Sequence, residues 1–346
     1  MTGTSLPRAA GAFPPLRWGQ LPRPIVALAP MDGVTDSAFR RVVRRLNPGV
    51  VLFSEFTSAE GFLRSPRVRS RLDFHPEEHP YFVQLFGSDP DAFAEAARQL
   101  EQQGVMGIDI NMGCPARKIV ASQHGSGLMR DVDAACRIVA RVAAACALPV
   151  SVKTRLGWSD SDSLIPFARA LENAGARLVT IHGRTYDQHF SGPADWTPIY
   201  ALKDALRVPV LGNGDVRDHD DGLGRLGNLD GFMIGRAAIG DPWIFRTRLG
   251  PGAAAPPTWA EKSRVMALHL AFALESKPAR AAVLEFRKHI AEYVRGFEDA
   301  KSLRRALMSV TDPDVVLRHI ESLAALDAGP RLALASGAEP DLAKAS

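Results

Sequence analysis

The stretch Gly107-Ile-Asp-Ile-Asn-Met-Gly-Cys-Pro115 begins as a short apolar run and ends in polar residues capable of chemistry. It is expected to bring Asn111 and Cys114 to the point where a strand passes into a loop. Seven further apolar runs along the chain end in the same way. A barrel of parallel strands carries its chemistry at the carboxyl ends of its strands, so the repeated pattern predicts a barrel with a reactive end.

The eight runs are continuous in hydrophobic residues rather than alternating, which is typical of strands buried on both faces. Helical patterns separate them and no dinucleotide-binding half-fold repeats, so the sequence predicts an α/β fold, a (β/α)8 TIM barrel. The expected strands are Ile25–Ala29, Val50–Phe53, Tyr81–Phe86, Gly107–Ile110, Val150–Lys153, Leu178–Ile181, Val208–Leu211 and Gly231–Ile234. The clearest expected helices are Ser37–Leu46, Asp91–Gln103, Val132–Ala145, Leu164–Ala174 and Pro198–Leu206.

Capping residues mark the ends of several of these helices. The expected N-caps are Asp36, Asp89, Asp131 and Asp162, and the expected C-caps are Gly104 and Gly175.

The run Leu249-Gly-Pro-Gly-Ala-Ala-Ala-Pro-Pro257 is rich in turn formers and predicts a domain boundary. Residues 21–250 are then the catalytic barrel, and residues 258–328 a small C-terminal bundle of about four helices. Residues 1–20 contain three prolines and no apolar signal core, so we expect a flexible leader there. We expect residues 329–346 to form a flexible tail.

The 346 residues are 46% apolar and 23% charged, an ordinary balance for a globular protein with a large core. No apolar run is long enough to span a bilayer. Cys136 and Cys146 lie on one expected helix about 15 Å apart, too far for a disulfide. With Cys114 as the third cysteine, the pattern favours a reducing cytoplasm.

The net charge of +4 is a mild basic bias with an uneven distribution. Residues 1–71 hold eleven Arg against four acidic residues, and residues 279–305 hold seven basic residues against four acidic ones. Such patches suit a polyanion. From charge alone, solvated arginine on helix faces is the favoured interpretation.

The polar residues at the strand ends are expected to converge on one end of the barrel. Besides Asn111 and Cys114 they include Met31, Asp32, Glu55, Gln84, Lys153, Arg155, Trp158, His182, Arg184, Thr185, Asn213, Asp215 and Arg236. Each alone has an ordinary structural explanation, such as a solvated charge or a core histidine. Their coincidence at the ends of successive strands predicts an active site.

Glycine-rich turns follow the last two expected strands, Gly212-Asn-Gly-Asp215 and Gly235-Arg236. Such turns commonly bind phosphate through backbone N–H groups, and Arg236 adds a charge-assisted contact. The alternative is simply tight turns. The G-x-G-x-x-G match at Gly222–Gly227 follows a polar run and precedes a strand, so it predicts the end of the seventh barrel helix rather than a dinucleotide site.

Three roles are open to Cys114. Nucleophilic attack with His182 as base is one. Zinc binding is discarded, because no ligand spacing accompanies the cysteine. Proton donation to carbon is the third, because an unperturbed thiol is neutral near pH 7. The sequence does not separate acid from nucleophile. The loop of residues 115–127 carries two glycines and suits a mobile segment that brings the thiol to its substrate.

Six motifs, in order over about residues 25–246, resemble those of the tRNA-dihydrouridine synthases. They are Leu28-Ala-Pro-Met-Asp-Gly-Val-Thr-Asp36, Asp109-Ile-Asn-Met-Gly-Cys-Pro115, Val152-Lys-Thr-Arg-Leu-Gly-Trp158, Ile181-His-Gly-Arg-Thr185, Gly212-Asn-Gly-Asp215 and Ile234-Gly-Arg-Ala-Ala238. Phe286-Arg-Lys-His-Ile290 and Ser302-Leu-Arg-Arg305 resemble the helical tRNA-binding domain of the bacterial B-type members.

The resemblance implies an FMN enzyme that takes hydride from NADPH and passes it to C6 of a uracil in tRNA, with Cys114 as the acid that protonates C5. The implied cofactor residues are Pro30, Met31, Asp32, Gln84, Lys153, His182, Asn213, Gly214, Asp215, Gly235 and Arg236. The implied substrate residues are Asn111, Arg155, Arg184, Arg287, Lys288, Arg304 and Arg305. No metal and no membrane are implied, and we expect a monomer.

Two other functions are compatible with parts of this pattern. A flavin reductase of free pyrimidines uses the same phosphate site and cysteine without the basic bundle. A non-enzymatic RNA-binding module keeps the fold alone, and the presence of Cys114, Lys153 and Arg155 argues against it.

Overall fold

The computed structural model describes residues 16–116, 120, 124–250, 253–296 and 300–328. Eight parallel strands close into a barrel: β1 pairs with both β2 and β9, and β2 also pairs with β4. The expected (β/α)8 TIM barrel is confirmed. Its strands are β1 (Ile25–Leu28), β2 (Val51–Phe53), β4 (Tyr81–Phe86), β5 (Gly107–Met112), β6 (Val150–Arg155), β7 (Leu178–His182), β8 (Val210–Asn213) and β9 (Gly231–Ile234). A two-residue strand, β3 (Thr57–Ser58), pairs with the carboxyl-terminal end of β4.

Several strands run further than the apolar runs predicted. Strand β5 continues to Met112 and β6 to Arg155, because Asn111 pairs with Lys153 in the parallel ladder. Strand β7 includes His182, which pairs with Arg155 on one side and Asn213 on the other. Polar residues expected in loops therefore lie in the last positions of strands, where ladder hydrogen bonds hold the backbone.

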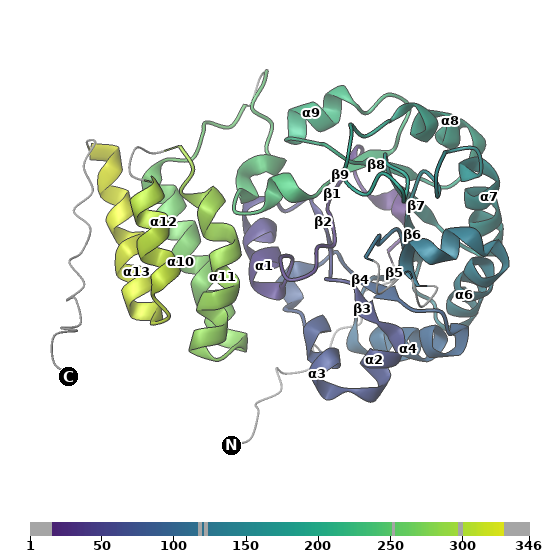
Figure 1. The fold of residues 1–346 in the computed structure, drawn as a ribbon, viewed down its shortest axis with the longest axis horizontal. Coiled ribbons are helices and arrows are strands. Elements are labelled where there is room, and N and C mark those ends of the chain that lie inside the picture. Colours follow the sequence, from purple (N-terminus) through teal and green to yellow (C-terminus); the bar gives the residue numbers. More distant parts are fainter. Residues whose placement is uncertain (1–15, 117–119, 121–123, 251–252, 297–299, 329–346) are drawn as a thin grey trace, which may run out of the picture. The chain divides into compact units, whose positions relative to one another are not determined.

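Helices lie outside the strands and enclose the barrel (Figure 1). They are α1 (Ser37–Leu46), α2 (Ala59–Arg64), α3 (Pro66–Arg69), α4 (Pro90–Gln103), α6 (Val132–Ala145), α7 (Leu164–Ala174), α8 (Thr197–Ala205) and α9 (His219–Gly224). The G-x-G-x-x-G match indeed covers the end of α9, the helix after the seventh barrel strand.

Helix caps follow the sequence with one exception. The carboxylates of Asp36, Asp89 and Asp131 accept hydrogen bonds from backbone N–H groups at the starts of α1, α4 and α6. Asp162 does not cap α7, contrary to expectation: Ser163 takes the N-cap position and makes no side-chain cap. Asp162 instead donates its N–H to the carboxylate of Asp160 in the preceding turn.

The packed part of the barrel begins before residue 21, where the expected leader ended. Trp18 lies in a short 3-10 helix, Trp18–Gln20, and is buried. Its ring stacks on Phe82 with centroids 4.5 Å apart, in a cluster with Ile25 and Leu178 from the first residues of their strands. The indole therefore covers the amino-terminal end of the barrel, opposite the strand ends that carry the polar residues. Residues 1–15 of the expected leader lie outside the described residues, as does the expected tail.

The chain divides into two compact units, the barrel (up to Ala238, with 242–254) and a helical unit (239–241 with 255 onward). The helical unit contains α10 (Trp259–Ser276), α11 (Ala279–Tyr293), α12 (Ala300–Ser309) and α13 (Pro313–Glu321), in agreement with the expected bundle of about four helices. Its core is apolar: Phe286, Ile290, Leu307 and Ile320 are buried there.

Candidate active site

Polar side chains from three adjacent strands share one level of the barrel interior. Gln84 pairs in register with Asp109, and Asp109 with Ser151. The Asp109 carboxylate accepts from Gln84 Nε2 at 2.6 Å and from Ser151 Oγ at 2.6 Å. All three side chains are buried. Burial raises the pKa of Asp109 to about 6, against hydrogen bonds from Gln84 and Ser151 and the charge of Lys153.

The same network continues to Cys114. Gln84 Oε1 accepts from Asn111 Nδ2 at 2.8 Å. Asn111 Oδ1 accepts from the backbone N–H groups of Gly113 at 3.0 Å and Cys114 at 2.9 Å. The side chain of Asn111 therefore holds the first turn of the cysteine loop onto the end of β5.

The Cys114 thiol is partly buried and electrically neutral at ordinary pH. Burial raises its pKa, against a hydrogen bond from the backbone of Ala116 and the charges of Arg155 and Lys153. A thiol with a raised pKa keeps its proton and is a weak nucleophile. A thiol that keeps its proton can donate it, which is one of the roles left open by the sequence.

Lys153 lies on β6 beside Asn111 on β5. No hydrogen bond or ion pair joins its ammonium group to another described residue. Burial lowers its pKa to about 8, and the nearby charge of Arg155 acts in the same direction, while Asp109 and Cys114 oppose them. Lys153 therefore carries its positive charge at neutral pH and loses it just above.

Arg155 connects the loops that follow β5 and β7. Its Nε donates to the carbonyl of Gly113 at 2.8 Å, and Nη1 donates to the carbonyls of Thr185 at 3.0 Å and His189 at 2.8 Å. The residue is only 3% exposed, and burial lowers its pKa to about 10. In this structure its guanidinium braces two loops at the barrel mouth, the end formed by the carboxyl ends of the strands.

His182 and Arg184 leave buried nitrogen atoms without hydrogen-bond partners among the described residues, Nδ1 of the first and Nη1 of the second. Burial lowers the pKa of His182 to about 2, together with the charges of Lys153, Arg155, Arg184 and Arg236, so the imidazole is neutral. Buried donors and acceptors without partners are rare in proteins. Because these two nitrogens lie at the carboxyl ends of the strands, they are available to a ligand at the barrel mouth.

Arg184 is otherwise tied to the neighbouring loops. Its Nη2 donates to the carbonyl of Gly192 and to the carboxylate of Asp215, both at 2.6 Å. The Asp215 carboxylate also accepts from the N–H of Ala194 at 2.8 Å. Partial burial acts to raise the pKa of Asp215, but the bonds from Arg184 and Ala194 outweigh it and the pKa is lowered.

The turn after β8 has an unusual backbone. Gly214 has φ +118° and Asp215 has φ +55°, both in the left-handed region. A Cβ at Gly214 would lie 2.8 Å from the Cβ of Ala194, so a side chain does not fit there. No hydrogen bond joins the N–H groups of Gly214 and Asp215 to another described residue. Asn213 supports the turn from below, donating Nδ2 to the carbonyl of Met233 at 2.8 Å.

Arg236 extends from the turn after β9 and is exposed, with 62% of its side-chain surface accessible. It approaches Asp215 at 3.5 Å and lies over the ring of Phe190 at 5.2 Å. Gly235 lies beside Met31: a Cβ there would be 3.9 Å from the Met31 sulfur. The turns after β1, β8 and β9 thus meet at the mouth.

The loop after β1 is held by a hydrogen bond within the loop and by an ion pair to Arg71. Met31 donates its N–H to Thr35 Oγ1 at 2.9 Å, which closes the turn that follows Pro30. The exposed carboxylate of Asp32 forms an ion pair with Arg71. Arg71, one of the eleven Arg of residues 1–71, is therefore bound to this loop rather than solvated on a helix face.

Sequence reasoning missed the role of Asp109 and did not include Phe190. Phe190 is 55% exposed, lies under the guanidinium of Arg155 at 5.5 Å, and meets the ring of His182 edge-on. An aromatic residue eight positions after the histidine gives no periodic signal, because its loop has none. Asp109 stood inside an apolar run, and a charged residue there is the signal that could have identified it.

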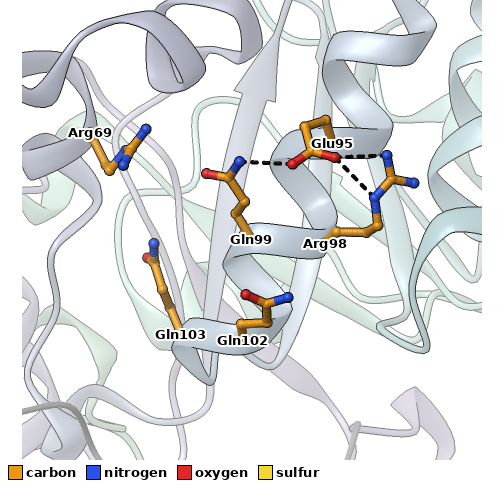
Figure 2. Close-up of a pocket in the computed structure, with 6 residues that line it drawn as sticks. All are labelled: Arg69, Glu95, Arg98, Gln99, Gln102 and Gln103. Atoms are coloured by element: carbon orange, nitrogen blue, oxygen red, sulfur yellow. Dashed lines mark hydrogen bonds and ion pairs between the residues drawn. The ribbon is translucent and has the colours of Figure 1, made fainter.

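The outside of the barrel also has a polar hollow, of about 460 Å³, lined by Arg69 and residues of α4. Figure 2 shows the carboxylate of Glu95 bonded to Arg98 and Gln99, with Gln102 and Gln103 further along the helix. These last residues lie toward the start of β5, at the end opposite the mouth. The hollow therefore does not belong to the strand-end site.

The described residues contain neither a metal-binding cluster nor a helix suited to span a membrane. No group of three His, Cys, Asp or Glu side chains there is placed to hold a metal ion. No described helix is long and apolar enough to cross a membrane.

The four basic residues expected to bind RNA in the helical unit differ in their surroundings. Arg287 is half-buried and donates Nη2 to the carbonyl of Val310 at 2.7 Å, which ties α11 to the end of α12. Lys288, Arg304 and Arg305 are exposed. Arg304 donates Nε to the carbonyl of Ala300 within its own helix at 3.2 Å.

Known proteins similar to this chain include tRNA-modifying enzymes and one more distant barrel. Probable tRNA-dihydrouridine synthase 1 of Synechocystis sp. is 39% identical over 295 residues, 82% of this chain and 82% of that protein. tRNA-dihydrouridine synthase B of Xanthomonas campestris is 36% identical over 303 residues, 85% of this chain and 91% of that protein. Histamine dehydrogenase from Rhizobium sp. 4-9 shares the fold alone, at 13% identity and a TM-score of 0.51, over 71% of this chain and 48% of that chain.

The family model described as dihydrouridine synthase matches residues 27–328, which include the strand-end residues and most of the helical unit. With the identity to its curated members, this match shows that the chain belongs to the dihydrouridine synthase family.

Proposed function

We propose that this protein reduces the C5–C6 double bond of a uridine in tRNA to 5,6-dihydrouridine, with FMN as cofactor and NADPH as reductant. One observation carries the proposal: a protonated thiol just after β5, a buried ammonium on β6 and a neutral imidazole at the end of β7 lie at one barrel mouth. The names of the relatives supply the substrate class.

The residues after β7, β8 and β9 fit a flavin mononucleotide. Arg236 and the N–H groups of Gly214 and Asp215 suit its phosphate, because phosphate binds where backbone donors and a guanidinium converge. The unpartnered Nδ1 of His182 is a further polar partner within the same group of loops. The walls of this flavin site are completed by Pro30, Met31, Asn213 and Gly235. Asp32 borders them, with its carboxylate engaged by Arg71.

When bound and reduced by NADPH, the flavin supplies a hydride to C6 of the uracil. Cys114 supplies the proton that C5 then requires, so the double bond gains one hydride and one proton. The raised pKa of the thiol keeps it protonated for this step. Solvent must return a proton to the sulfur before the next turnover.

Lys153 stabilises negative charge that develops on the electron-accepting ring or on the uracil carbonyl. A buried cation does this well because little water screens it. Its lowered pKa of about 8 leaves it charged at neutral pH. Gln84 contributes mainly by holding Asn111, since both ends of its amide are bonded inside the protein.

Arg155, Arg184 and Asn111 shape the substrate side of the site. Each already makes hydrogen bonds to loop backbone, so we assign them to holding the loops that frame the uracil, with their remaining polar groups facing it. Phe190 offers an exposed ring on which a base can stack, which is worth about 1–3 kcal/mol in single-stranded nucleic acid.

The direct test is product formation. Purified protein, FMN and NADPH are incubated with unmodified tRNA, and nucleosides are analysed for the two-hydrogen mass gain of dihydrouridine. Free uracil and uridine are tested in parallel. Product from tRNA supports the proposal. Product from the free base alone favours the pyrimidine reductase, and no product together with a protein that does not retain flavin removes the proposal.

RNA contact by the helical unit has its own test. Lys288→Gln, Arg304→Gln and Arg305→Gln together should weaken tRNA binding and reduce its salt dependence, because each phosphate contact releases counterions. Arg287→Gln is expected mainly to lower stability, because Arg287 bonds Val310. An unchanged salt slope in the triple variant contradicts the assignment.

A further inference from the structure

Asp109 occupies the inner end of a directional chain of hydrogen bonds. Its carboxylate accepts from Gln84 Nε2 at 2.6 Å, Gln84 Oε1 accepts from Asn111 Nδ2 at 2.8 Å, and Asn111 Oδ1 accepts from the N–H of Cys114 at 2.9 Å. Asp109 is 1% exposed and Gln84 is fully buried, so water does not replace these partners.

The direction of this chain follows from the chemistry of its first member. An ionised carboxylate only accepts hydrogen bonds, whereas an amide has one donating and one accepting end. At pH 7 Asp109 is mainly ionised, since its pKa is raised only to about 6 by burial. Gln84 must therefore turn its NH2 toward Asp109 and its oxygen toward Asn111. Asn111 must in turn offer its NH2 to Gln84, which leaves Oδ1 for the backbone of Gly113 and Cys114.

We propose that Asp109 is a positioning residue: it sets the order of the Gln84 and Asn111 amides and thereby holds the backbone of Cys114 at the barrel mouth. Its consequence for catalysis rests on the proposed function, in which Cys114 is the acid. The hydrogen-bonding claim itself stands on the contacts above. Ser151, which donates to the other carboxylate oxygen, fixes the rotation of Asp109.

Without an obligate acceptor at position 109, nothing at the inner end of these hydrogen bonds fixes the orientation of the Gln84 amide. If Gln84 turned over, its NH2 would face the NH2 of Asn111. Asn111 would then have to turn as well, and its NH2 would point at the N–H groups of Gly113 and Cys114. The N–H groups of Gly113 and Cys114 would then lose the one side-chain acceptor that they share, Asn111 Oδ1.

An inverted pair of substitutions tests the direction of the chain. Asn111→Asp puts carboxylates at both ends of Gln84, whose single NH2 serves only one of them. While that NH2 stays on Asp109, the carboxylate at 111 faces Gln84 Oε1 and is repelled by it. The side chain at 111 then shifts, and its bonds to the N–H groups of Gly113 and Cys114 should weaken. Adding Asp109→Asn to the Asn111→Asp protein should restore a complete set of hydrogen bonds, in the reverse direction. The new amide donates to Gln84 Oε1, Gln84 Nε2 then donates to the carboxylate at 111, and that carboxylate still accepts from Gly113 and Cys114.

Two readouts follow the turn without relying on tRNA reduction: hydrogen exchange of a peptide that contains Gly113 and Cys114, and the rate of Cys114 alkylation by iodoacetamide. Asn111→Asp should speed amide exchange by about tenfold, the fold-change for one lost hydrogen bond, and the double variant should reverse most of it. Because neither readout needs flavin or tRNA, failure of the proposed function would leave the result intact.

Glu55→Gln, introduced into the Asn111→Asp protein, is the matched control. Glu55 is also a buried acid at the mouth, with its carboxylate bonded to the N–H of Gly33 and outside the Gln84 chain. It should give no rescue. Equal rescue by Glu55→Gln, additive effects of the substitutions at 109 and 111, or an unperturbed Asn111→Asp protein would each overturn the proposal. If Asn111→Asp is insoluble, a folded double variant supports the proposal and an insoluble one overturns it.

Discussion

The two halves of the barrel mouth differ in how their polar groups are satisfied. In the cysteine half, the ends of β4, β5 and β6, the side chains of Gln84, Asp109 and Asn111 bond one another, and the ammonium of Lys153 beside them makes no bond to another described residue. In the arginine half, the ends of β7, β8 and β9, buried nitrogens of His182 and Arg184 have no partner among the described residues.

This difference separates two tasks. The cysteine half is arranged in advance around Cys114, as a group that must deliver a proton at a defined place requires. The arginine half combines unpartnered donors with an exposed Arg236 and left-handed turns, which suits a site completed by an anionic ligand. We therefore expect variants in the first half to change turnover and variants in the second to change cofactor retention.

The largest effect is expected at Cys114. Cys114→Ala should lower dihydrouridine formation by about 10²–10⁴-fold, the usual contribution of a general acid, while flavin stays bound and reducible by NADPH. Single-turnover assays on tRNA measure the change. Cys136→Ala, a cysteine on the outer helix α6, is the control and should be active. Wild-type turnover in Cys114→Ala would show that the cysteine half does not deliver the proton.

Lys153 provides a test by pH. Its pKa is lowered to about 8, so it is charged below that pH and loses its charge as the pH rises through it. The rate of the hydride step should fall over this range. Lys153→Gln should remove the pH dependence and lower the rate by about 10²-fold, the lower end of the usual loss for one electrostatic contact to developing charge. Lys153→Arg should be active with the falling limb absent. A limb that persists in Lys153→Gln belongs to another group.

Gly214→Ala examines the arginine half. The left-handed backbone and the 2.8 Å approach to Ala194 should lower the free energy of unfolding by about 2 kcal/mol. Flavin retention should fall as well, because the turn changes shape. Urea unfolding and flavin content measure both. Gly224→Ala, with open space around it, is the control and should be neutral. Equal stabilities of the two variants would show that the turn is not constrained.

The smallest effect on stability is expected for Arg236→Ala. The side chain is largely exposed, so the free energy of unfolding should stay within about 0.5 kcal/mol of the wild type. Flavin affinity should fall by about tenfold through loss of one charge-assisted contact. Flavin occupancy after dialysis measures the change in affinity. Full occupancy in Arg236→Ala would show that Arg236 does not bind the flavin phosphate.

Local sequence predicted most of the framework, because burial of strands and capping of helices depend on nearby residues. Asp36, Asp89 and Asp131 cap their helices as expected. Asp162 does not, because α7 begins one residue later than expected and Ser163 takes the N-cap position. The strand ends were placed too early, since hydropathy falls at Asn111 and Lys153 while the ladder between them continues.

The partners of the site residues could not be predicted in the same way. Gln84, Asp109 and Ser151 meet because three strands align at one level, and that register depends on the closed barrel. Arg71 reaches Asp32 across 39 positions, so a residue assigned to a surface patch belongs to the mouth. Phe190 lies beside His182 because its loop folds back over β7.

The amino-acid sequence by itself determined the alternation of strands and helices, the polar residues at the strand ends and the basic helical region, since these follow from hydropathy, periodicity and charge. The tertiary structure alone decided which polar atoms are bonded and which are not. A hydrogen bond or an unpartnered buried nitrogen depends on distances of a few tenths of an ångström between segments far apart in the chain, and only the closed barrel sets those distances.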